Sequence, residues 1–177
     1  MIRKIFFFSA ILVLSFFTFK FSGDFKFYLL QIKAYYDLRP VVQDLDEVSK
    51  NQIGQVIDLG TIGYSEDDLF FRYSELNCKV CVDETFEILL DSTTNRKNIY
   101  LLIDFSNSRY LQLLLKRNRF NSQNVIFVEK GKIFPDVDAI NQPYIFTVSK
   151  DGKVQSFFIV MNEFPSRTRR YVSSIER

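Results

Sequence analysis

From residue 68 onward, apolar segments of strand length alternate with amphipathic segments of helix length. The strand-like runs are residues 68–73, 99–103 and 125–128, and the helical patterns between them are residues 80–90 and 107–120. Two further strand-like runs, residues 144–148 and 154–160, flank Asp151-Gly152, a dipeptide typical of a hairpin turn, and residues 166–175 form a last helical pattern. Strands joined through helices pair in parallel, whereas a hairpin pairs antiparallel. The sequence therefore predicts an α/β fold with a central mixed β-sheet flanked by helices.

The N-terminal segment has the layout of an export signal. Arg3 and Lys4 precede an uncharged apolar run over residues 5–19, which Lys20 and Phe21 follow. Cations before such a run hold that end in the cytoplasm, so we expect the rest of the chain outside the cytoplasmic membrane, on the periplasmic side of the cell envelope. Phe21 is bulky where signal peptidase needs a small side chain, which favours an uncleaved signal anchor over a cleaved signal peptide. We therefore expect a transmembrane helix over residues 5–21. A buried helix of a soluble protein is the alternative, and its nearly all-round apolarity argues against it.

The 177 residues suit one domain with appendages. We expect a signal segment over residues 1–23, a stalk or lead-in helical segment over residues 24–51 and a folded domain over residues 52–177. In the middle segment, residues 25–38 have helical spacing, and this helix is expected to end before Pro40, because a proline disfavours helical backbone in the residue before it.

Composition excludes several classes of chemistry. The chain has no histidine, which removes Ser-His-Asp and Cys-His catalysis and histidine metal sites. Its two cysteines cannot complete a tetrahedral zinc site unless carboxylates or a second chain supply the other ligands, so we expect no metal. We also expect no cofactor. With 23 Lys and Arg against 21 Asp and Glu, the chain lacks the basic surplus that nucleic-acid binding needs.

Cys78 and Cys81 form a C-x-x-C motif that follows a strand-like run and opens a helical one. In this context the motif is typical of redox chemistry. Unpaired amides at a helix N-terminus favour the thiolate, which is the nucleophile in disulfide exchange, and Lys79 adds a positive charge. Cys78 is thus the candidate attacking thiol and Cys81 the resolving thiol. The alternative is a permanent disulfide between Cys78 and Cys81 that staples an exported domain.

The motif and the C-terminal pattern together resemble the thioredoxin-like superfamily, in its membrane-anchored TlpA/ResA-type thiol-disulfide oxidoreductase branch. The matching residues are the C-x-x-C after a hydrophobic strand, then Gln142-Pro143 before the strand-like run 144–148, and Lys150 to Lys153. The short run 125–128 resembles an insertion of that branch, and the resemblance covers about residues 52–177. It implies that Pro143 is a cis-proline beside the disulfide and that the backbone of Gln142 pairs with an extended substrate chain.

Two positions depart from the family pattern. Asn77 replaces the usual aromatic residue before the first cysteine, and Arg72 stands where thioredoxins carry a buried acid. A cation at that position favours thiolate character but removes the proton acceptor for the resolving thiol. The carboxylates Asp83, Glu84 and Glu87 are expected to lie off the core-facing stripe of their helix.

The leading hypothesis is an exported, membrane-tethered thiol-disulfide oxidoreductase that acts on protein disulfides or dithiols. By the resemblance, a reductant of envelope proteins is favoured slightly over an oxidase. The alternative is a redox-inactive thioredoxin-fold interaction module in which Cys78 and Cys81 form a structural disulfide. A peroxidase is less favoured, because the Thr/Pro and Arg surroundings of a peroxidatic cysteine are missing before Cys78.

Overall fold

The computed structural model describes residues 33, 36–59, 63–66, 68–75, 77, 79–92, 98–105, 108–117, 120–161 and 163–175. The expected membrane segment over residues 5–21 and the expected thiol of Cys78 lie outside the described residues. The chain divides into two units between Asp44 and Leu45, and the second unit contains the sheet. The proposed limits at residues 23 and 51 stay predictions.

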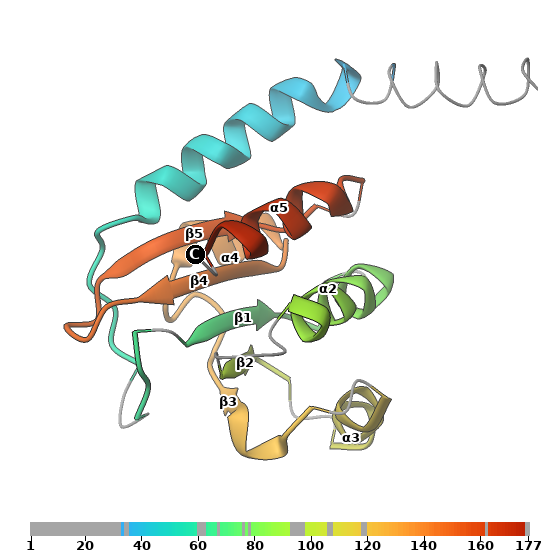
Figure 1. The fold of residues 1–177 in the computed structure, drawn as a ribbon, viewed down its shortest axis with the longest axis vertical. Coiled ribbons are helices and arrows are strands. Elements are labelled where there is room, and N and C mark those ends of the chain that lie inside the picture. The colour runs from blue at the N-terminus through green and yellow to red at the C-terminus, as the bar shows by residue number, and fades with distance from the viewer. Residues whose placement is uncertain are drawn as a thin grey trace, which may run out of the picture. The chain divides into compact units, whose positions relative to one another are not determined.

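A mixed five-stranded sheet forms the centre of the second unit (Figure 1). Its strands are β1 (Leu69–Tyr73), β2 (Ile99–Ile103), β3 (Val125–Phe127), β4 (Tyr144–Val148) and β5 (Val154–Ile159). The order is β3-β2-β1-β4-β5, in which β1, β2 and β3 are parallel and β4 is antiparallel to both β1 and β5. The predicted mixed sheet is confirmed. β1 is the central strand, and its carboxyl end leads into the C-x-x-C motif.

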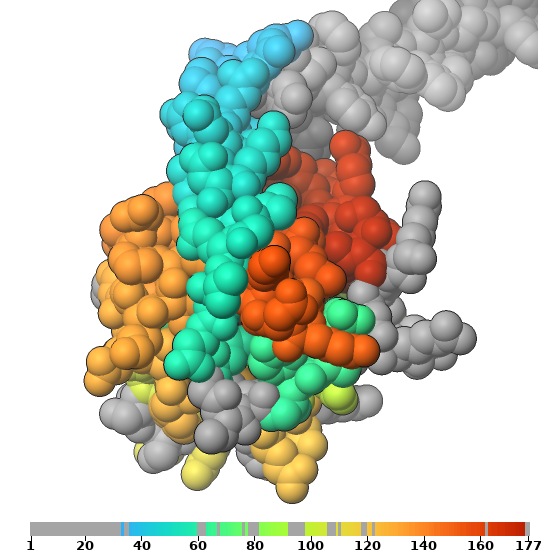
Figure 2. Space-filling view, turned by 90° about the vertical axis from the view of Figure 1, so that its left-hand side faces the viewer, coloured from blue at the N-terminus to red at the C-terminus, as the bar shows by residue number. Residues whose placement is uncertain are grey.

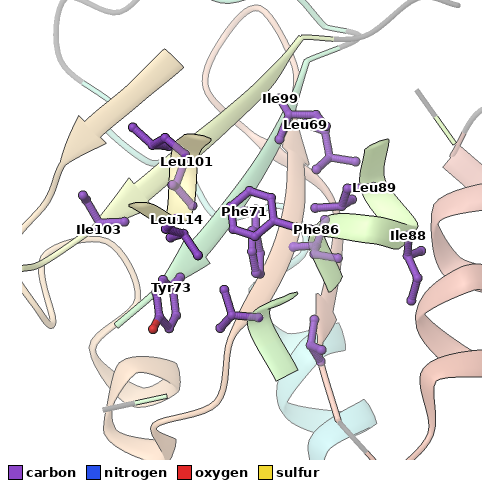
Figure 3. Packing of buried hydrophobic residues seen from close by; sticks show 14 of the residues in the cluster. Leu69, Phe71, Tyr73, Phe86, Ile88, Leu89, Ile99, Leu101, Ile103 and Leu114 are labelled. Carbon is purple, nitrogen blue, oxygen red and sulfur yellow. The ribbon is translucent and has the colours of Figure 1, made fainter. Parts of the chain in front are cut away.

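Three helices cover one face of this sheet. They are α2 (Lys79–Ser92), α3 (Ser108–Arg117) and α5 (Pro165–Ile175), and α2 packs beside α5 (Figure 1). Phe71 of β1 points toward Phe86 of α2, with the ring centroids 5.3 Å apart in a T-shaped arrangement (Figure 3). The buried residues of these helices recur at helical spacing, which is why each helix has one apolar face. They are Val82, Phe86 and Leu89 in α2, Leu111, Leu114 and Leu115 in α3, and Val172 in α5.

The opposite face of the sheet is lined by aromatic rings and by one buried cation. Side chains alternate along a strand, so Phe70 and Arg72 lie on this face while Phe71 lies on the other. Phe70 stacks on Phe146 with centroids 5.1 Å apart, and Phe134 packs edge-on against Phe157 at 4.9 Å. Phe134 immediately precedes α4 (Pro135–Ile140) and thereby holds this helix near the same face.

The sequence interpretation missed α4 and treated its residues as loop. With six residues, α4 is too short for hydrophobic periodicity to be recognised. Its boundaries do carry local signals. Pro135 is at the start of the helix, where its missing N–H costs nothing, and Asn141 ends the helix in the left-handed conformation with φ 57°.

Residues 54–57 form backbone hydrogen bonds with the β4–β5 hairpin. Gly152 has φ 74° and donates its N–H to the Ser149 carbonyl, as the Asp-Gly hairpin signal predicts. Residues 54–57 then pair with the hairpin: Gly54 N–H donates to the Val154 carbonyl at 2.8 Å, and Ile57 N–H donates to the Gly152 carbonyl at 3.0 Å. Figure 2 shows this end of the molecule, with the turquoise segment beside the deeper orange hairpin.

The expectation that a helix ends before Pro40 is wrong. Residues 36–52 are helical, and Pro40 lies within them. A proline removes one helical hydrogen bond and its ring clashes with the preceding turn, and this helix continues in spite of that cost. Beyond Pro40, the residues Leu45, Ser49 and Gln52 recur at helical spacing and are all buried, so packing stabilises this part of the helix. None of the helices in the described ranges combines the length and apolarity that crossing a bilayer requires.

Candidate functional site

The C-x-x-C motif lies where the central strand passes into α2. β1 ends at Tyr73, and α2 begins at Lys79, the residue after Cys78. Cys81 belongs to the first turn of α2 in its backbone, and its side chain is outside the described part. A helix N-terminus at this position offers unpaired amides and the positive end of the helix dipole to a neighbouring thiolate. The strand, loop and helix that the motif needs for redox chemistry are thus present in this order.

Asn77, the residue before Cys78, is buried and joins two loops. Its side-chain oxygen accepts the Ser74 N–H at 2.7 Å, and its own N–H donates to the Ser74 carbonyl at 2.9 Å. Its side-chain NH₂ donates to the Asn141 carbonyl at 2.6 Å. Only 6% of Asn77 is exposed. From the sequence, Asn77 was recognised only as a departure from the family pattern. In the structure its side-chain amide forms hydrogen bonds with both loops, which an aromatic ring could not do.

Gln142 and Pro143 directly follow Asn141, the residue that Asn77 contacts in the second loop. Gln142 is exposed, and within the described part no hydrogen bond joins it to another residue. Pro143 is buried, and its carbonyl accepts the Val160 N–H at 2.8 Å. Through the bond between Asn77 and Asn141, the structure brings the loop before Cys78 next to the loop that carries Gln142 and Pro143.

The expectation of a cis-proline at position 143 is wrong. The described residues contain no cis peptide bond, so Gln142 and Pro143 are joined in trans. The trans form is favoured by about 0.5–1 kcal/mol before proline, and the fold must supply contacts to reverse that preference. Here the Pro143 carbonyl pairs with Val160 and the Asn141 carbonyl pairs with Asn77, so both backbone acceptors around Gln142 are satisfied with the trans bond.

Arg72, the other departure from the family pattern, is neutralised within the protein. Its side chain is 2% exposed and forms ion pairs with Asp104 at 3.1 Å and Asp138 at 3.5 Å. It also donates to the Val128 carbonyl at 3.2 Å. With two carboxylates around one guanidinium, Arg72 is not a free positive charge that could favour a thiolate at Cys78. It lies on the sheet face opposite α2, in a polar network that sequence reasoning did not find.

Asp104 connects this network to the loop before the motif. One carboxylate oxygen accepts from Arg72, and the other accepts the Glu75 N–H at 3.2 Å. Asp104 directly follows β2, which is the parallel neighbour of β1. The carboxyl ends of adjacent parallel strands meet at one edge of a sheet. The position of Asp104 directly after β2 could therefore have predicted that it lies near the end of β1 and can pair with Arg72. Asp104 therefore supports the loop that follows β1 through its bond with Glu75.

Asp138 connects the same network to α4 and β4. It accepts the Tyr144 hydroxyl at 3.0 Å and the Gly131 N–H at 2.6 Å. Burial, and then the charge of Asp138, raise the pKa of Tyr144 far above its ordinary value. Tyr144 therefore stays protonated and serves as a hydrogen-bond donor. Arg72 thus holds together the loop before the motif and the helix that precedes Gln142 and Pro143.

The carboxylates on α2 lie away from the core, as the sequence predicts. Glu87 is exposed, Asp83 and Glu84 are half-buried, and Asp83 forms an ion pair with Arg117 of α3 at 2.8 Å. Among the described residues, no group of three or more cysteine and carboxylate side chains is arranged to hold a metal ion.

Comparison with known proteins gives structural neighbours only. No family model and no curated protein matches the chain. A secreted disulfide oxidoreductase of Mycobacterium tuberculosis, homologous to E. coli DsbE, shares 11% identity over 60% of this chain and 80% of its own, with a TM-score of 0.41. A thioredoxin-like protein from Parabacteroides distasonis shares 5% identity over 68% and 92%, with a TM-score of 0.44. A thiol:disulfide interchange protein from Bacteroides sp. shares 13% identity over 68% and 86%, with a TM-score of 0.42.

These neighbours are thioredoxin-like proteins and thiol-disulfide oxidoreductases, the superfamily that the motifs resemble. The strand order, the parallel strands β1 to β3 and the antiparallel β4–β5 hairpin define a mixed α/β fold with a central sheet.

Proposed function

We propose that this protein is a thiol-disulfide oxidoreductase that is tethered to the cytoplasmic membrane and acts on proteins outside it. The observation that supports this most is the hydrogen bond from Asn77 to Asn141, which joins the loop before Cys78 to the loop before Gln142 and Pro143. A reactive thiol at the start of α2 would then lie close to an exposed stretch of backbone. This combination suits a protein substrate, since such a substrate presents both a disulfide and an extended chain.

The reaction proceeds by two displacements at sulfur. The Cys78 thiolate attacks one sulfur of a substrate disulfide, forms a mixed disulfide and releases the other substrate sulfur as a thiolate. The Cys81 thiolate then attacks the Cys78 sulfur, which releases the second substrate sulfur. The products are a disulfide between Cys78 and Cys81 and a reduced substrate, so two electrons pass to the substrate. An external dithiol restores the reduced pair by the reverse sequence.

Gln142 supplies the binding contact in this proposal. It is exposed and makes no hydrogen bond to another described residue, so its backbone is free to pair with a substrate chain. Pro143 fixes the adjacent backbone and donates no N–H. Strand-like pairing of this kind recognises the backbone of the substrate, and it therefore accepts different protein sequences.

The envelope location comes from the N-terminal sequence. Arg3 and Lys4 before the apolar residues 5–19 favour a signal anchor with the folded unit outside the cytoplasm. In that setting a reductant needs a steady supply of electrons from a dithiol donor, because the compartment itself is oxidising. We favour reduction of envelope proteins over their oxidation.

Dithiothreitol-dependent reduction of insulin by the full-length protein in detergent micelles tests the activity. We expect the wild type to accelerate insulin reduction, and Cys78→Ser to abolish the acceleration. Cys81→Ser should retain attack but lose resolution. Because the chain has two cysteines, each variant leaves a single thiol whose adducts are unambiguous by mass spectrometry. Equal rates for the wild type and Cys78→Ser would favour the redox-inactive interaction module with a structural disulfide.

A further inference from the structure

We infer that Asn77 is a positioning residue that holds the loop leading into Cys78 beside the loop whose backbone binds a protein substrate. The inference rests on the proposed function and assigns to this residue a role in selecting protein disulfides over small ones. The side-chain amide of Asn77 is buried and forms hydrogen bonds with two separate loops.

The two contacts of the Asn77 side chain do different things. The oxygen accepts the Ser74 N–H at 2.7 Å and so closes a turn inside the loop between β1 and α2. The NH₂ group donates to the Asn141 carbonyl at 2.6 Å and so reaches a loop that is 64 residues away in the sequence. The first contact shapes the loop before Cys78, whereas only the second fixes its position relative to Gln142.

The partner loop is itself held firmly, so the bond fixes a distance. Asn141 ends α4 in the left-handed conformation, and its N–H donates to the Asp138 carbonyl at 3.3 Å. The Asp138 side chain is bound by Arg72, Tyr144 and Gly131. Lys130 donates to the side chain of Asn141, whereas Asn77 donates to its backbone carbonyl. Movement of this loop would disturb the buried Arg72 network.

Fixed spacing matters to one class of substrate. A protein substrate that pairs with the backbone of Gln142 has its disulfide carried to Cys78 at a set distance, and small misplacements slow a reaction between bound partners. A small disulfide needs no contact with Gln142 and reaches Cys78 by free diffusion. Loss of the Asn77 to Asn141 bond should therefore slow attack on proteins more than attack on small disulfides.

The variant Asn77→Ser separates the two contacts without changing charge. A serine hydroxyl can still accept the Ser74 N–H in a turn, but it is too short to reach Asn141. The matched control is Asn51→Ser, the same substitution at an exposed helical residue whose backbone carbonyl, and not its side chain, accepts the Gln55 amide. Full-length protein in detergent is assayed with insulin and with bis(2-hydroxyethyl) disulfide, using dithiothreitol as the electron donor.

We expect Asn77→Ser to lower kcat/KM for insulin by about fivefold, the factor that corresponds to one neutral hydrogen bond. The rate with bis(2-hydroxyethyl) disulfide should stay within about twofold of wild type, and Asn51→Ser should match wild type on both substrates. Equal losses on both substrates would overturn the inference, because Asn77 would then act on the reactivity of the thiol. An unchanged insulin rate would overturn it as well.

Amide hydrogen exchange tests the same contact without turnover. In Asn77→Ser we expect faster exchange over residues 138–146 as well as over residues 74–77. Faster exchange over residues 74–77 alone would contradict the inference, since Asn77 would then only shape its own turn. A wild-type protein that reduces neither substrate would contradict the proposed function, and the exchange result would still decide whether Asn77 couples the two loops.

Discussion

Arg72 shows how one residue can have a different role from the one that its sequence position suggests. Its place before Cys78 invites comparison with a buried acid, yet its guanidinium points to the opposite face of the sheet and is bound by two aspartates and a carbonyl. A buried charge of this kind is stable only when it is paired. Arg72 therefore stabilises the loops around the candidate site and does not act on the thiols.

Removing the Arg72 cation should destabilise the fold strongly. In Arg72→Met two carboxylates lose their partner inside the protein, and we expect a loss of about 3–5 kcal/mol in the free energy of unfolding, measured by urea denaturation. Arg117→Met is the matched control: its guanidinium is 70% exposed in the ion pair with Asp83, so its loss should cost less than about 1 kcal/mol. Similar losses in the two variants would contradict the role of Arg72.

Tyr144 predicts how stability changes at high pH. Its pKa is raised in the folded state, so its contribution is complete below the ordinary tyrosine pKa of about 10 and is lost as pH rises above that value, where the unfolded chain ionises first. Unfolding measured in urea between neutral pH and strongly alkaline pH should show this decline. Tyr144→Phe should flatten it, and adding Tyr171→Phe should flatten it further, because burial also raises the pKa of Tyr171. A decline as steep in the double variant as in wild type would contradict this assignment.

At the scale of elements, the hairpin turn is tied to a preceding segment through Gly152. Its φ is 74°, and a Cβ added there would lie 2.9 Å from the Ile57 carbonyl oxygen. Gly152→Ala therefore adds a backbone clash to the cost of a left-handed conformation, which is about 1–2 kcal/mol by itself. Gly131→Ala is the control, since its φ is 77° and no atom lies within 4 Å of the added Cβ. Urea denaturation should show a larger loss of stability for Gly152→Ala, and equal losses would contradict the packing of residues 54–57 on the hairpin.

Elements with a strong local pattern were predictable from the sequence. The strands, α2, α3, α5 and the hairpin follow from apolar periodicity and from Asp151-Gly152. The helix through Pro40 and the short α4 were not, because tertiary packing overrides a proline and six residues show too little periodicity. At the site, the order of strand, motif and helix was predicted. The partners of Arg72 and the bond from Asn77 to Asn141 were not, because these contacts join residues that are 32 to 66 positions apart.

At the scale of the whole molecule, the membrane tether is a separate prediction from the redox chemistry. The apolar residues 5–19 with Arg3 and Lys4 in front should hold the full-length protein in the membrane fraction after carbonate extraction. A variant that carries Glu at Leu12 and Leu14 should be released into the soluble fraction, because charges in the centre of a membrane helix are costly. Full-length protein that carbonate releases would contradict a signal anchor while leaving the site untouched.

In the proposed mechanism, Cys78 attacks substrate disulfides and Cys81 resolves the resulting adduct. This order of attack is tested by incubating reduced full-length Cys81→Ser and Cys78→Ser separately with disulfide-bonded insulin, followed by mass spectrometry. We predict a stable mixed disulfide between insulin and Cys78 in Cys81→Ser, and little or none through Cys81 in Cys78→Ser. A Cys78 thiol that forms no adduct, even after full reduction, would contradict the claim.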